Sequence, residues 1–155
     1  MSPAAATGSG RRSHLRHAEA QEVWIGFGGR ADQLWLRLLR PGFRHCFAAL
    51  RDGSGWTVLD PLSGRLLVTR LDAPGGFDLP GFWRRAGCTV LGPFRPAAPR
   101  ARRPWLSPFS CVSLCRALLG PGAPRAVTPF GLFRGLDRQE KISRKIFLTT
   151  LQARM

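Results

Sequence analysis

The stretch from Phe43 to Leu62, FRHCFAALRDGSGWTVLDPL, decides the fold. Two extended apolar runs flank an Asp52-Gly53 pair, which is the strongest short-range signal for a β-hairpin. With this pair at the centre of a two-residue turn, counting back along both strands places His45 directly opposite Asp60. Directly opposed residues share one face of a sheet, with Cβ atoms about 5 Å apart. The hairpin therefore predicts a histidine beside a carboxylate, and a slip of one residue would separate them.

The rest of the chain predicts an α+β protein in which a small antiparallel sheet packs on a cysteine-bearing helix. Apolar runs closed by glycine or proline indicate strands, and apolar spacing of three or four residues indicates helices. We expect further strands at 23–27, 66–71 and 88–91, a helical turn at 82–85, and helices after Asp32, at 111–119 and at 130–136. Pro61 follows Asp60 directly, which predicts that its strand lies at an edge or ends early.

A length of 155 residues suits one domain. We expect a disordered basic tail over residues 1–20, a single α+β domain over 21–136, and a C-terminal tail over 137–155 that is helical or poorly ordered. Residues 1–10 lack the apolar core of a signal peptide, and no apolar run reaches the roughly 18 residues of a membrane span. We therefore expect a cytoplasmic or phage-associated protein.

The charge is strongly basic, with 24 Lys and Arg against 9 Asp and Glu and a net charge of +15. Such a balance favours a polyanionic partner. Only Lys141 and Lys145 are lysines, however, and the chain has no Tyr and no Asn. A GC-rich genome produces the same arginine-rich composition, so the charge has two competing explanations.

Cys111 begins the helix expected at 111–119, with Ser107 or Ser110 as its cap. The helix dipole and the free N–H groups of the first turn favour a thiolate and can also hold an oxyanion. Cys115 lies one turn deeper, where a packing role is expected. A cysteine at a helix start, a histidine and a polar group that orients the histidine are the parts of an acyl-transfer site. The alternative is that Cys111 and His45 are ordinary core residues.

Metal binding and disulfides are not expected. The four cysteines are Cys46, Cys88, Cys111 and Cys115, and none forms a CxxC pair. His45 and Cys46 are adjacent, so on a strand their side chains point to opposite faces. We expect no metal and no cofactor.

The segments GFRHCFAAL, WTVLDPLSG, PFSCVSLCRALLG and TPFGLFRGL resemble the circularly permuted branch of the NlpC/P60 (papain-like) superfamily, in which the histidine precedes the cysteine helix. They also resemble small phage- or prophage-associated proteins of proteobacteria. The resemblance covers residues 23–136 and implies Cys111 as nucleophile, His45 as base and Asp60 as the residue that orients the base. For the oxyanion side chain that many members supply, Trp24 and Ser110 are the candidates.

The expected function is a cysteine hydrolase or acyltransferase that acts on a peptide, amide or ester. One alternative is a non-enzymatic phage-associated binding or structural protein of the same fold. Another is a nucleic-acid-binding protein that uses arginine clusters at Arg11-Arg12, Arg84-Arg85 and Arg100 to Arg103, with interleaved aromatic residues.

Overall fold

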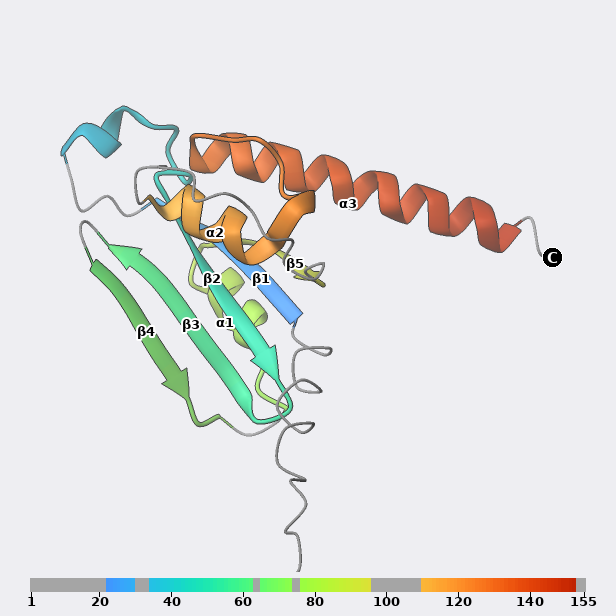
Figure 1. Cartoon of the computed structure of the whole chain (residues 1–155), viewed down its shortest axis with the longest axis horizontal. Coiled ribbons are helices and arrows are strands. Elements are labelled where there is room, and N and C mark those ends of the chain that lie inside the picture. The colour runs from blue at the N-terminus through green and yellow to red at the C-terminus, as the bar shows by residue number, and fades with distance from the viewer. Residues whose placement is uncertain (1–21, 30–33, 63–64, 74–75, 96–109, 153–155) are drawn as a thin grey trace, which may run out of the picture.

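A computed structural model describes residues 22–29, 34–62, 65–73, 76–95 and 110–152. The expected tail at 1–20 and the arginines at 100–103 lie outside these ranges. The described strands form one antiparallel five-stranded sheet in the order β4-β3-β2-β1-β5 (Figure 1). The elements are β1 (Glu22–Gly28), β2 (His45–Asp52), β3 (Gly55–Leu62), β4 (Arg65–Leu71), α1 (Leu79–Arg85), β5 (Thr89–Phe94), α2 (Cys111–Leu119) and α3 (Pro129–Gln152), with short 3₁₀ helices at Leu34–Leu38 and Gly120–Gly122. The α+β class is as predicted.

Helices cover both faces of the sheet. On one face, α2 and the start of α3 pack over β1 and β2, and the core contains Ile25, Phe27, Cys46, Cys115 and Leu132, all fully buried. On the other face, α1 covers a smaller cluster built around Ala49, Trp56 and Leu79. Figure 1 shows α2 in front of the sheet and α1 behind it. The sheet is thus the middle layer of three.

The β2–β3 hairpin forms, but its predicted register is wrong by two residues. Asp52 pairs with Gly55 and Ala48 pairs with Leu59, so Gly53 and Ser54 form the turn. The Asp52 side chain accepts a hydrogen bond from the Ser54 N–H, which holds it at the edge of the turn instead of inside it. Because a shift of two residues preserves the alternation of side chains, His45 and Asp60 still share a face.

The two hairpin strands separate at the end where His45 lies. Pairing between β2 and β3 stops at Ala48 and Leu59, whereas β2 stays paired with β1 as far as His45. β3 is an interior strand and stays paired with β4 as far as Leu62. The expected edge position of β3 is therefore wrong. The expected early end holds only for its pairing with β2, in keeping with a proline that has no N–H to donate. We call this open end of the β2–β3 ladder the seam.

Helix α3 is far longer than the short helix predicted at 130–136. Leu132 and Leu136 are buried, and Phe130 and Phe133 pack their rings against Phe43. From Lys141 onward, every residue whose exposure is described is exposed, and Figure 1 shows this half projecting beyond the sheet. The pairs Asp137–Lys141 and Glu140–Arg144, each at 2.7 Å, support the continuation, since i,i+4 ion pairs stabilise a helix. Within the described residues, no helix is both long and apolar enough to cross a bilayer.

Candidate active site

His45 and Asp60 form a direct pair at the seam. Nε2 of His45 lies 2.6 Å from Oδ1 of Asp60, and the two side chains are 16% and 31% exposed. His45 is the first residue of β2, and Asp60 stands near the end of β3. A carboxylate on one ring nitrogen fixes the orientation of the imidazole and stabilises its protonated form. The other nitrogen, Nδ1, is left for a further partner.

Cys111, the first residue of α2, also interacts with His45. The Ser110 side chain accepts a hydrogen bond from the Ser113 N–H at 3.1 Å, and the Ser113 hydroxyl accepts one from the Ser110 N–H at 2.8 Å. This reciprocal cap fixes the start of the helix, as predicted for Ser110. Cys111 is half-buried, and its side chain is hydrogen-bonded to those of His45 and Cys46. Asp60, His45 and Cys111, from three separate elements, are therefore linked in one chain of polar contacts.

The ionisation of the pair is set by these contacts. Hydrogen bonds from the Cys46 thiol and from His45, with the Cys46 backbone N–H, outweigh burial and lower the pKa of Cys111 to about 4. Burial opposes the charged form of His45, but Cys111 and Asp60 outweigh it and raise the pKa of the imidazole to about 9. Between these values Cys111 is a thiolate and His45 an imidazolium, the ionic form of an activated cysteine.

Cys46 is a site residue that the sequence analysis missed. It is fully buried, and its thiol contacts both Cys111 and Cys115, which raises its own pKa far above the ordinary range. It therefore stays protonated and acts as a donor to Cys111. The signal was its position beside His45, which was set aside because neighbours on a strand point to opposite faces.

The seam explains how both neighbours reach one sulfur. Cys46 belongs to the core under α2, whereas His45 stacks against Phe47 on the face covered by α1. Cys111 accepts a hydrogen bond from the Cys46 backbone N–H, beyond the last β2–β3 pair. The start of α2 thus meets the sheet at its open end, where a single atom can touch side chains from either face.

A cavity of about 820 Å³ adjoins the pair on the α1 side. Its polar wall is His45 and Asp60, and its apolar wall includes Phe47, Val58 and Trp83. Trp83 comes from α1, which begins at an Asp78 cap that accepts the Gly81 N–H at 2.9 Å. Mainly apolar cavities with a few convergent polar groups are typical of small-molecule sites.

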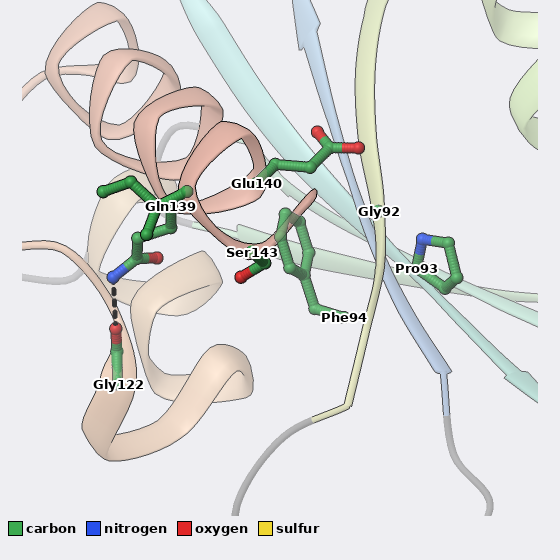
Figure 2. Close-up of a pocket in the computed structure, with 8 residues that line it drawn as sticks. Gly92, Pro93, Phe94, Gly122, Gln139, Glu140 and Ser143 are labelled. Atoms are coloured by element: carbon green, nitrogen blue, oxygen red, sulfur yellow. Dashed lines mark hydrogen bonds between the residues drawn. The ribbon is translucent and has the colours of Figure 1, made fainter. Parts of the chain in front are cut away.

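A second hollow, of about 550 Å³, lies between β5 and α3 (Figure 2). Two of its polar side chains are already engaged: the Gln139 amide donates to the Gly122 carbonyl at 3.0 Å, and Glu140 pairs with Arg144. Among the described residues that line it, none is a cysteine or histidine. It offers no activated nucleophile, so the seam is the candidate active site.

The two oxyanion candidates fare differently. Trp24 pairs with Ala49, four residues along β2 from His45, or about 13 Å at the usual rise of a strand, and it packs under α1. That candidate was wrong. Ser110 lies beside Cys111, but its hydroxyl caps the helix. The backbone N–H groups of Cys111 and Val112, in the first turn where no helical carbonyl precedes them, are the donors that the site offers.

The remaining expectations concern metals and arginines. In the part of the chain that the structure describes, no group of three or more Cys, His, Asp or Glu residues is arranged to hold a metal ion.

Of the arginine pair Arg84-Arg85, Arg84 lies over the Trp24 ring and donates to the Val90 carbonyl at 3.2 Å. Arg84 thus braces α1 against the sheet. Arg11-Arg12 and the arginines at 100–103 lie outside the described residues.

Comparison with models of protein families, with curated proteins and with solved structures finds no match for this chain. The seam geometry itself is therefore the basis for assigning a function.

Proposed function

We propose that the protein is a cysteine hydrolase or acyltransferase acting on an amide or ester, with Cys111 as nucleophile, His45 as base and Asp60 orienting His45. The observation that carries the proposal is the chain of polar contacts from Asp60 through His45 to Cys111. A nucleophile, a base within reach and a group that orients the base are the signature of nucleophilic acyl transfer.

In the proposed reaction, the Cys111 thiolate attacks the carbonyl carbon and forms a carbon–sulfur bond. The negative charge moves to the carbonyl oxygen, where the N–H groups at the start of α2 stabilise it. The tetrahedral intermediate collapses, the bond to the leaving group breaks, and His45 gives its proton to that group. Neutral His45 then takes a proton from water or from an acceptor alcohol or amine, whose attack on the thioester releases the acyl group and restores the thiolate.

The order of the elements supports the permuted papain-like arrangement as part of this proposal. The histidine strand β2 comes first, β3 with Asp60 follows, and the cysteine helix α2 comes last. The net charge of +15 is compatible with several kinds of anionic environment, so it does not identify the class of substrate.

A direct test is to look for the acyl-enzyme. The purified protein is mixed with p-nitrophenyl acetate, quenched, digested and analysed by mass spectrometry. We expect one acetyl group on the peptide that contains Cys111 and steady release of p-nitrophenol. Cys111→Ala should abolish both, whereas the matched control Cys115→Ala, one turn deeper in α2, should retain them.

Absence of an acetylated Cys111, or equal turnover by Cys111→Ala, would overturn the proposal. Adding benzylamine separates the two reaction types. A hydrolase returns acetate, and an acyltransferase diverts the acetyl group to the amine.

A further inference from the structure

The cavity beside His45 carries an inference about the substrate. Its apolar wall is formed by four half-buried side chains: Phe47, Val58, Leu62 and Trp83. Phe47 and Trp83 meet edge to face, with ring centroids 4.7 Å apart. Apolar surface turned toward a cavity and not covered by the protein itself favours an apolar ligand.

The position of the cavity distinguishes the two sides of the scissile bond. His45 and Asp60 line it, whereas Cys111 does not. In acyl transfer the acyl group stays on the cysteine, and the leaving group departs toward the acid that protonates it. The side of His45 that is open to the cavity is therefore the leaving-group side.

Two features hold the apolar wall in place. The Phe47 ring lies across Gly26 of β1, where a Cβ atom would collide with it. Trp83 belongs to α1. The hydrogen bond from Arg84 in the last turn of that helix to the Val90 carbonyl holds α1 against β5. The wall is built from strands and a capped helix, so its shape is preorganised.

We infer that the cavity binds a bulky apolar leaving group, of the size of a benzyl group or an aromatic side chain, with Trp83 as a specificity-determining residue. This inference rests on the proposed function. A volume of about 820 Å³ accommodates such a group together with the bonds that connect it to the carbonyl. A difference of one apolar group in a pocket changes selectivity by about 10- to 200-fold.

The experiment compares benzyl acetate with ethyl acetate, which differ in the leaving group, and ethyl phenylacetate with ethyl acetate, which differ in the acyl group. We expect kcat/KM to favour benzyl acetate over ethyl acetate by about tenfold or more. Trp83→Ala should reduce that preference to near unity. Phe82→Ala removes an exposed ring from the same helix outside the cavity, so it should keep the preference.

A binding measurement separates the inference from the reaction. In the Cys111→Ala background, N-benzylacetamide is titrated while the side-chain NMR signals of His45 and Trp83 are followed. We expect saturable shifts of both signals. The His45 shift should be lost in the double variant with Trp83→Ala and kept with Phe82→Ala. Binding without turnover by the parent protein would overturn the proposed function alone. Turnover with no leaving-group preference, or titration without shifts, would overturn the inference.

Discussion

Nε2 of His45 lies 2.6 Å from Oδ1 of Asp60, although the two residues are not opposite each other in the β2–β3 ladder. Extending the pairing of Ala48 with Leu59 would place His45 opposite Leu62. The pair is therefore diagonal, across strands that have separated. Long side chains can still meet across such a diagonal. The separation gives the imidazole a carboxylate on one side and leaves room for Cys111 on the other.

Asp60→Asn should weaken the proposed base. An amide cannot stabilise the imidazolium as a carboxylate does, so the pKa of His45 should fall below about 9. We expect kcat for p-nitrophenyl acetate to drop by about 10²- to 10⁴-fold. Asp72→Asn, an exposed carboxylate just after β4, is the matched control. A kcat equal to that of the control would show that Asp60 does not orient His45.

The pH dependence of kcat/KM should be a broad bell. The active form has Cys111 as thiolate and His45 protonated. The acid limb should lie near pH 4, where Cys111 gains a proton, and the alkaline limb near pH 9, where His45 loses one. Stopped-flow rates between pH 3.5 and 10 measure both limbs. A single rise with a midpoint near pH 6.5 would instead indicate a neutral thiol activated by an unperturbed histidine.

Cys46→Ala should raise the pKa of Cys111, because a hydrogen bond from the Cys46 thiol helps to lower that pKa. The pH profile of Cys111 alkylation should shift to higher pH. The small cavity left by the substitution should also lower the free energy of unfolding by about 1 kcal/mol. Cys115→Ala removes an equally buried thiol that contacts Cys46, and it should leave the profile nearly unchanged. Equal profiles in the two variants would contradict this role.

Gly26→Ala should distort the apolar wall. A Cβ at this position would collide with the Phe47 ring, so the ring or the strand must shift. Overpacking of this kind costs about 1–3 kcal/mol, which urea unfolding can measure. Gly53→Ala adds a methyl group in open space in the hairpin turn and should be close to neutral. If both variants unfold at the same urea concentration as the parent, Phe47 is not confined by Gly26.

Local signals predicted most of the elements and the three polar residues of the seam. The Asp-Gly pair indicated the hairpin, and Ser110 indicated where α2 begins. The two-residue error in register arose because the Asp52 side chain bonds to the turn. The site survived because side chains alternate with a period of two.

Tertiary contacts decided what the sequence left open. Cys46 entered the site only because the strands separate, and no periodicity shows where a ladder ends. Trp24 looked suitable as an oxyanion donor, but the pairing of β1 with β2 places it far along the strand. The C-terminal half of α3 is exposed, and the ion pairs that support its continuation lie within the helix itself.

The ionisation of Cys111 tests the central claim most directly. Iodoacetamide alkylates thiolates, so the rate of Cys111 modification, followed by mass spectrometry of its peptide, reports the fraction ionised at each pH. In the parent protein we predict a midpoint near pH 4, and in His45→Ala a midpoint moved toward the ordinary thiol value of about 9. A midpoint near 9 in the parent, unchanged in His45→Ala, would contradict the account.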